Sequence, residues 1–359
     1  MPVAGEPVKS GSASPTDRLA SAERFARDIL PSVSRTFALS IRVLPGDLGR
    51  AVLAAYLLCR IADTLEDEPD LPAESKAELL DELARCFDDS VAADAFPSRV
   101  EALHGEVAHV RLTKNTDLAF VLYRSLPPGT QAHVRRWVGE MISGMRKFVL
   151  LYPNGIRIQS LEEYREYCYY VAGTVGYLLT DLWHEHAPSI GERQYRVLRE
   201  KCRAFAEALQ TVNILKDVAT DAEQENSIYI PEELLRTHGS SHATILAPER
   251  LPDTREALAT LVQLAWHDLE SARSYLLSIP RRAVPIRLFC VLPLLFAYAT
   301  LRDLTRTPHA LARREVVKIS RREVKSLTLI GFLVIMSNRG LGWLADRAMR
   351  RPFVVAGLR

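Results

Sequence analysis

The chain has little of what marks several common protein classes. Its five cysteines are scattered and form no CxxC pair, which argues for reduced thiols in a cytosolic setting and against a disulfide framework. The formal net charge is only +2, and no Lys/Arg-rich block has the character of a nucleic-acid footprint, so no nucleic-acid partner is expected. Alternating strand patterns and hairpin turns are also scarce, which disfavours a β-protein.

Membrane and export signals are equally weak. The N-terminus, MPVAGEPVKSGSASP, lacks the apolar segment of a signal peptide, and residues 1–16 are predicted to form a flexible leader. The apolar run LTLIGFLVIM at 327–336 has half of the roughly 20 residues that a membrane span needs, so it predicts a buried helix. Residues 336–359 form a basic tail, for which we expect peripheral membrane contact at most. A cytoplasmic monomer is the expectation.

What the sequence does contain is helical periodicity. Apolar residues recur every three to four positions over long segments, and no Gly/Ser-rich linker or internal repeat divides the chain. The prediction is one all-α domain over residues 17–335. The expected helices cover residues 15–30, 37–41, 47–66, 73–92, 117–125, 127–152, 161–183, 191–220, 253–278, 283–303 and 313–350.

A polar stripe interrupts one of these apolar helices. Within YLLCRIADTLED, the residues Tyr56, Arg60, Asp63 and Asp67 step by four, three and four positions, and Glu66 lies at the edge of the same face. Side chains at this spacing lie about 5–6 Å apart, close enough for carboxylates to share cations. Taken alone, such a stripe is more typical of a solvated helix surface with an internal Arg–Asp pair.

A second stripe makes the pattern more informative. In ALQTVNILKDVATD, Gln210, Asn213, Asp217 and Asp221 step by three, four and four positions. If the two helices face each other, four aspartates converge, and their mutual repulsion would raise their pKa values unless divalent cations neutralise them. Mg²⁺ holding a diphosphate is the natural occupant, because Mg²⁺ combines one or two carboxylates with substrate phosphate oxygens.

Other signals admit two interpretations each. Gly173 and Gly176 in a helix interior indicate either close helix packing or space for a ligand, and packing is favoured. Gly144, with a methionine on either side along its helix, is typical of core packing. The basic stretch that begins at Arg313 and ends at Lys325 is either a solvated helix face or a phosphate contact.

Together these motifs resemble the squalene/phytoene synthase family, and more closely its squalene synthase branch. The resemblance runs in the same order from residue 34 to about residue 321. The matching segments are SRTF at 34–37, the segment 56–67 that ends in DTLED, YCYYVAG at 167–173, the segment 210–217, FC at 289–290 with Pro293, ATL at 299–301 and VKI at 317–319.

The resemblance implies a single isoprenoid synthase helical bundle around a central apolar cavity. It also implies that two farnesyl diphosphates condense head to head to presqualene diphosphate, which NADPH then reduces to squalene. Asp63, Glu66, Asp67, Asp217 and Asp221 would bind Mg²⁺, and the four aspartates would be catalytic. The substrate-binding residues would be Ser34, Arg35, Phe37, Tyr56, Arg60, Gln210 and Asn213. Tyr170 would transfer a proton, and Lys318 and Arg321 would contact NADPH.

The chain departs from the family pattern at several positions. The segment NSIYIP at 226–231 stands where the family often has an arginine before a proline, and Thr220 replaces an acidic residue beside Asp221. Ser320 stands where squalene synthases tend to have a basic residue, and no GxGxxG fingerprint supports NADPH binding. The alternatives are therefore a phytoene, dehydrosqualene or hydroxysqualene synthase, or a catalytically inactive helical assembly factor. The pathway served, hopanoid or sterol, stays open.

Overall fold

The computed structural model describes residues 14–307 and 317–349, and these ranges contain helices, turns and a single isolated bridge between Arg157 and Ile228. The prediction of an all-α fold is therefore confirmed. The helices are α1 (Pro15–Val33), α2 (Arg35–Arg42), α3 (Gly46–Asp67), α4 (Ala73–Arg85), α5 (Ser90–Arg99), α6 (Val107–Thr113), α7 (Thr116–Arg124), α8 (Pro128–Leu151), α9 (Leu161–Cys168), α10 (Thr174–His186), α11 (Glu192–Arg199), α12 (Cys202–Gln224), α13 (Glu232–Thr237), α14 (Leu251–Ser278), α15 (Val284–Arg306), α17 (Arg321–Val334) and α18 (Asn338–Met349), with a π-helical turn (Tyr169–Gly173) after α9 and a 3₁₀ turn (Pro248–Arg250) before α14.

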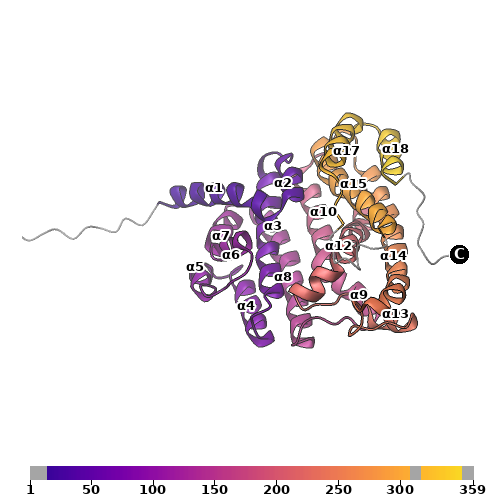
Figure 1. Cartoon of the computed structure of the whole chain (residues 1–359). Helices are drawn as coiled ribbons and strands as arrows, with labels where there is room; N and C mark the ends of the chain where they lie inside the picture. Colours follow the sequence, from indigo (N-terminus) through magenta and orange to yellow (C-terminus); the bar gives the residue numbers. More distant parts are fainter. Residues whose placement is uncertain (1–13, 308–316, 350–359) are drawn as a thin grey trace, which may run out of the picture.

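The middle of the molecule consists of α3, α8, α10 and α12 (Figure 1). Helix α3 packs against α8 and α10, and α10 packs in turn against α12. Helices α4, α6 and α7 cover α3 on one side, whereas α14 and α15 cover α12 on the other. This order places the two helices that carry the polar stripes in the interior of the bundle, each with an apolar side to bury.

The glycines in the α10 region pack as predicted. A Cβ atom on Gly176 would lie 2.3 Å from the carbonyl oxygen of Cys202, which shows that α10 and α12 touch backbone to backbone. A Cβ atom on Gly173 would meet the ring of Tyr169 at 3.0 Å and Oε1 of Glu207 at 3.1 Å. Close helix contact therefore accounts for both glycines.

Three of the predicted helices are divided in the structure. The segment 191–220 contains α11 and most of α12. The segment 73–92 is divided into α4 and α5, because the carboxylate of Asp89 accepts hydrogen bonds from the N–H groups of Val91 and Ala92 and so begins a new helix. The segment 313–350 contains two helices, α17 and α18, and its residues 313–316 lie outside the described part of the chain.

Helix α18 also corrects the predicted end of the domain. It packs against α14, α15 and α17, and residues such as Leu341 and Leu344 are buried. The boundary at residue 335 is therefore too early, and the folded domain continues through Met349.

The apolar run 327–336 is not the buried helix that was predicted. Only Leu327, Gly331 and Ile335 are buried. Four large apolar side chains of the same run are exposed to between 52% and 73%: Leu329, Phe332, Leu333 and Met336. The sequence supplied more apolar side chains than one helix packed on α15 and α18 can bury.

Helix α15 is instead a deeply buried apolar helix. By length and composition it could cross a membrane, but 78% of its most apolar window is buried inside the protein, as expected for a core helix. Its Arg287 is fully buried and donates hydrogen bonds to the carbonyl oxygens of Ile279 and Ile335 and to Oδ1 of Asn338. This guanidinium ties the turn between α17 and α18 to the core.

All five cysteines are free and buried. They lie in separate parts of the fold, at Cys59, Cys86, Cys168, Cys202 and Cys290. Burial raises the pKa of every one of these thiols, to about 12 for Cys86 and Cys202. The prediction of reduced, non-bridged thiols agrees with this placement.

The buried carboxylate of Asp181 predicts an acid-sensitive contribution to stability. Burial acts to raise its pKa, but hydrogen bonds from His133, Trp137 and Tyr195 and the charge of Arg199 outweigh burial and hold the pKa at about 2. Because this value lies below the unfolded value of about 3.9, the stabilisation is present above pH 4 and is lost as the pH falls from about 4 to 2. Asp181→Asn is expected to cost about 2–3 kcal/mol in urea unfolding at pH 7.

An exposed carboxylate provides the matched control for this experiment. Asp88 pairs with Arg135 at 2.8 Å at the surface, where such pairs contribute little. Asp88→Asn should therefore change the free energy of unfolding by less than about 1 kcal/mol. Equal losses in both variants, or a loss in Asp181→Asn that persists unchanged at pH 2, would contradict the assignment.

Candidate functional site

The first polar stripe is the only break in the buried surface of the central part of α3. Between residues 51 and 66 every side chain is buried except those of Tyr56, Arg60, Asp63 and Thr64. Arg60 pairs with Asp63 at 3.3 Å, and the hydroxyl of Tyr56 donates to the carbonyl oxygen of Val33 at 3.3 Å. The spacing read from the sequence therefore gives one open face on an otherwise enclosed helix.

The second stripe has the same character on α12. Its side chains that are not buried between residues 207 and 221 form a single face, made of Leu209, Gln210, Asn213, Lys216, Asp217 and Thr220. Asn213 is exposed although α10, α14 and α15 pack against its helix. Lys216 pairs with Asp217 at 3.0 Å. Asp221 is buried at the C-terminal end of this face.

The two stripes lie within electrostatic reach of each other. Burial raises the pKa of Asp221 to about 9, with further contributions from the negative charges of Glu225, Asp217 and Asp67. Burial and the charges of Glu225 and Asp63 likewise raise the pKa of Asp67 well above its usual range. Because Asp67 ends α3 and Asp221 lies on α12, the carboxylates of the two helices repel one another, as the two-stripe hypothesis requires.

Sequence reasoning missed two charged residues of this cluster. Glu225 extends the second stripe by one more four-residue step from Asp221, and burial together with the charge of Asp217 raises its pKa. Lys76, at the start of α4, donates from Nζ to the carbonyl oxygen of Glu66 at 2.7 Å. The repeated step of four after Asp217 and Asp221 was a usable signal for Glu225, whereas nothing in the local sequence marks Lys76.

Glu66 connects the first stripe to a row of aromatic rings. Its Oε2 accepts a hydrogen bond of 3.5 Å from Tyr167, whose ring stacks on Tyr229 at 4.9 Å between centroids. The ring of Tyr167 also meets Phe148 edge-on at 5.1 Å, and Phe148 meets Tyr170 at 6.5 Å. The row therefore leads from the carboxylates to the predicted proton-transfer residue.

The ring of Tyr170 packs directly against the backbone of α8, because the residue opposite it on α8 is Gly144. A Cβ atom on Gly144 would lie 2.0 Å from Cγ of Tyr170. The π-helical turn (Tyr169–Gly173) inserts into an otherwise continuous helical segment at this point, and such turns are frequent at functional sites. The contact with Tyr170 thus requires a glycine at position 144, which the methionine pattern around it did not reveal.

The SRTF segment is where α2 begins. The hydroxyl oxygen of Ser34 accepts a hydrogen bond from the N–H of Phe37 at 3.2 Å, so Ser34 is the N-cap of α2. Phe37 lies 5.7 Å from Tyr56 and 6.4 Å from Phe289 between ring centroids. The side chain of Arg35 lies outside the described part of the structure, so its predicted role stays a prediction.

The predicted NADPH residues lie on a different part of the chain from the helices of the two stripes. Lys318 and Arg321 are exposed at the beginning of α17, and neither makes an ion pair with the described residues of the carboxylate cluster. Helix α17 packs mainly on α15 and α18. Their assignment to a cofactor stays a prediction.

The segment after the second stripe is held in place. The N–H of Ile228 donates to the carbonyl oxygen of Ile156, and the N–H of Ile158 donates to that of Ile228. Asn226 begins the segment 226–231, where the family often has an arginine, and its Oδ1 accepts a hydrogen bond of 2.7 Å from Arg157. Arg157 thus brings a guanidinium to this segment from another part of the chain. Its hydrogen bonds, however, are made to the loop itself.

The carboxylate cluster suits Mg²⁺ in its donor chemistry. Oε1 of Glu66 is buried and has no hydrogen-bond partner, and burial together with neighbouring carboxylates raises the pKa of Glu66 and Asp67 well above the usual range. Among the described residues, however, no three metal-binding side chains are gathered closely enough to hold a metal ion by themselves. Oxygen ligands that are incomplete without substrate are what Mg²⁺–diphosphate sites use.

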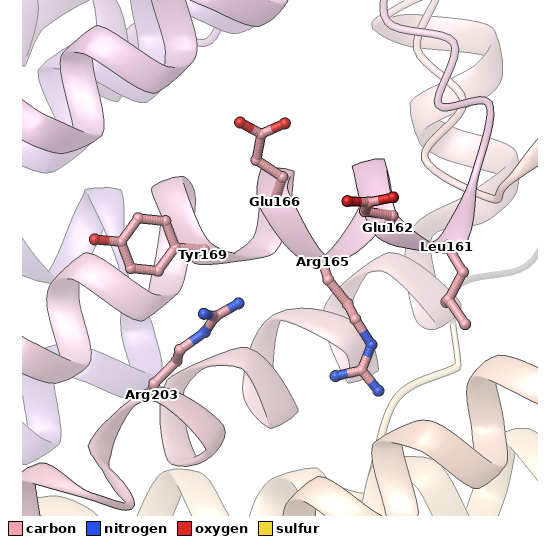
Figure 2. A pocket seen from close by; sticks show the side chains of 6 residues that line it. All are labelled: Leu161, Glu162, Arg165, Glu166, Tyr169 and Arg203. Carbon is pink, nitrogen blue, oxygen red and sulfur yellow. The ribbon is translucent and has the colours of Figure 1, made fainter.

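A surface pocket of about 520 Å³ lies elsewhere, between α9, the π-helical turn and α12. Figure 2 shows Arg203 beside the ring of Tyr169, and Cζ of Arg203 lies 4.9 Å from the centroid of that ring. The lining residues are Leu161, Glu162, Arg165, Glu166, Tyr169 and Arg203. None of the predicted site residues lines this pocket.

An all-helical bundle with two facing carboxylate stripes is the isoprenoid synthase fold. Solved structures with similar folds agree with this assignment. The chain matches the structure of TcSQS with the ligand E5700 at a TM-score of 0.75 and 22% identity, covering 92% of this chain and 97% of that one. It matches a dehydrosqualene synthase in complex with a ligand at a TM-score of 0.59 and 20% identity, covering 93% and 100%.

The chain belongs to the squalene/phytoene synthase family, whose model matches residues 30–323. It is 27% identical over 290 residues to the squalene synthase of Schizosaccharomyces pombe, covering 79% of this chain. It spans only 60% of the length of that relative.

Proposed function

We propose that the protein is a prenyltransferase that makes squalene from two molecules of farnesyl diphosphate. In the first half-reaction one substrate loses diphosphate and a proton, and the product is presqualene diphosphate. In the second, this intermediate loses its diphosphate and takes up a hydride. The observation that carries the proposal is the convergence of Asp67 and Asp63 on α3 with Asp217, Asp221 and Glu225 on α12.

The residues of the cluster suggest how the chain would promote ionisation. Bound Mg²⁺, held by Asp63, Asp67, Asp217 and Asp221 together with diphosphate oxygens, would supply positive charge to the leaving group. Arg60, oriented by Asp63 at 3.3 Å, adds a fixed positive charge at the same face. These side chains act on the diphosphate end of the substrate.

The aromatic row suits the other end of the substrate. The rings of Phe37, Tyr56, Phe148 and Tyr167 lie around the two stripes, and their faces attract a carbocation while their apolar surfaces exclude water. The hydroxyl of Tyr170 is the candidate group for moving the proton in the first half-reaction. NADPH would supply the hydride of the second, with Lys318 and Arg321 as exposed cations suited to its phosphates.

A different product is the second candidate. Phytoene, dehydrosqualene and hydroxysqualene synthases share the condensation chemistry, and the fold similarity to a dehydrosqualene synthase favours neither outcome. A catalytically inactive assembly factor is the alternative outside enzymes. Retention of both aspartate pairs and of Tyr170 speaks for catalysis, because a scaffold gains nothing from carboxylates that repel one another.

The proposed function predicts a product that depends on the reductant. Purified protein is incubated with farnesyl diphosphate and Mg²⁺, with and without NADPH, and the products are separated by gas chromatography and mass spectrometry. We expect presqualene diphosphate without NADPH and squalene with it. A set of products that NADPH does not change would reject squalene synthesis, and no turnover under either condition would reject the prenyltransferase itself.

A further inference from the structure

Five large apolar side chains on α17, on the turn after it and on α18 are exposed, and we call them together the C-terminal apolar face. On α17, Phe332 and Leu333 follow Leu329 by three and four residues, so these side chains share one side of the helix, and Met336 follows in the turn after it. Trp343 on α18 is 47% exposed, and α18 packs against α17. The face is made of Leu329, Phe332, Leu333, Met336 and Trp343.

Cations continue this face in both directions. Arg322 and Lys325 precede Leu329 by helical steps on the same side of α17, and Arg339 lies in the first turn of α18, three residues after Met336. All three side chains are exposed, and none makes an ion pair with a described residue. Exposed cations thus precede the apolar side chains on α17 and follow them at the start of α18.

The acidic residues nearby do not neutralise these cations. Residues 317–349 contain only two acidic side chains, and each is engaged by an arginine of another helix. Glu323 pairs with Arg302 of α15, and Asp346 pairs with Arg273 of α14 at 2.7 Å. The surface therefore presents unbalanced positive charge beside exposed apolar side chains.

Charge distinguishes between the possible occupants of this face. In a symmetric contact with a second copy, Arg322, Lys325 and Arg339 of each chain would approach the same cations of the other, and like charges brought together cost energy. An anionic bilayer satisfies both features, because its headgroups attract the cations while its acyl region accepts the leucine and phenylalanine side chains. Trp343 suits the boundary between the two regions.

We propose that the C-terminal apolar face docks the folded domain onto the surface of an anionic lipid bilayer. Leu329, Phe332, Leu333 and Met336 enter the acyl boundary, and Arg322, Lys325 and Arg339 contact the headgroups. The docking element is a part of the folded domain, fixed to the core by Arg287, and it is separate from the carboxylate cluster.

The test is flotation of the full-length protein with lipid vesicles. Vesicles of phosphatidylcholine alone are compared with vesicles of phosphatidylcholine and phosphatidylglycerol, at low and high salt. We expect binding to the anionic vesicles that weakens with salt. The double variant Phe332→Ser/Leu333→Ser should lower the apparent partition coefficient by about tenfold or more, because each large apolar side chain contributes to insertion.

The controls separate this face from general stickiness. Val91 and Val107 are exposed to 75% and 83% on α5 and α6, so Val91→Ser/Val107→Ser removes as many exposed apolar side chains at another place and should leave binding unchanged. Lys325→Glu/Arg339→Glu should abolish the preference for anionic vesicles. Circular dichroism of each variant checks that the helices are intact.

Several results would overturn the proposal. One is wild-type protein that floats with neither kind of vesicle. Another is undiminished flotation of Phe332→Ser/Leu333→Ser, which would assign membrane contact to a different part of the chain. A third is a concentration-dependent dimer, detected by analytical ultracentrifugation, that this double variant dissociates, because that would identify a second copy as the occupant. None of these readouts depends on catalytic turnover, so they are independent of the proposed function.

Discussion

Replacing Asp217 by Asn is expected to lower turnover of farnesyl diphosphate by about a hundredfold to a thousandfold, with helical content unchanged. The side chain keeps its size but loses the charge that would hold Mg²⁺ against the diphosphate. Asp217 is half-buried on the open face of α12 and pairs only with the adjacent Lys216, so its loss removes no contact that holds two helices together. Asp63→Asn should give a loss of the same order from the α3 side.

The control for the aspartate variants lies on the same helix as Asp63. Asp47, in the first turn of α3, pairs with Arg50 at 3.0 Å and is exposed, so Asp47→Asn removes a carboxylate of α3 far along the helix from the cluster. Its turnover should equal that of the wild type. The initial rate of diphosphate release measures all three variants, and full activity in Asp63→Asn and Asp217→Asn would end the two-stripe model.

Gly144→Ala is expected to impair both stability and activity. Its Cβ atom would lie 2.0 Å from Cγ and 2.4 Å from Cβ of Tyr170, so the tyrosine must leave its position. Overpacking of this kind costs about 1–3 kcal/mol. Since Tyr170 is the proposed proton-transfer residue, we expect turnover to fall by at least about tenfold, because displacement of a catalytic group by even 1 Å is costly.

Helix α8 offers a matched control five residues earlier. A Cβ atom on Gly139 would have no neighbour within 4 Å, so Gly139→Ala should stabilise the protein by about 0.5–1 kcal/mol through helix propensity alone. Thermal unfolding and turnover are measured for both alanine variants. If they behave alike, the contact between Gly144 and Tyr170 does not constrain the site.

Hydrophobic periodicity was sufficient to predict helices that are packed mostly in the interior. The prediction of a helix over residues 127–152 agrees with α8 (Pro128–Leu151), whose proline at the start is a strong local signal. Both polar stripes were found because a polar residue on a buried helix breaks an otherwise apolar pattern. The family itself followed from motif order, which the family model confirms.

What the sequence did not reveal depends on contacts between distant segments. Lys76 reaches the backbone of Glu66 only because α4 folds back along α3, and Gly144 matters only because Tyr170 lies opposite it. The exposure of Leu333 could not be predicted either, since an apolar run does not show how much of it the neighbouring helices will cover. In each case the missing information is tertiary.

The burial of all five thiols also has a kinetic consequence. A disulfide reagent in solution reacts with the thiolate, and here each thiol is both shielded and held in its protonated form. Labelling must therefore wait for a local or global opening of the helix that carries the cysteine. Cys59 on α3 and Cys202 on α12 lie on the two helices of the carboxylate cluster, and Cys290 lies on the core helix α15. The labelling rates of Cys59 and Cys202 would thus report the local opening of the helices at the site, and the rate of Cys290 would report the opening of the core.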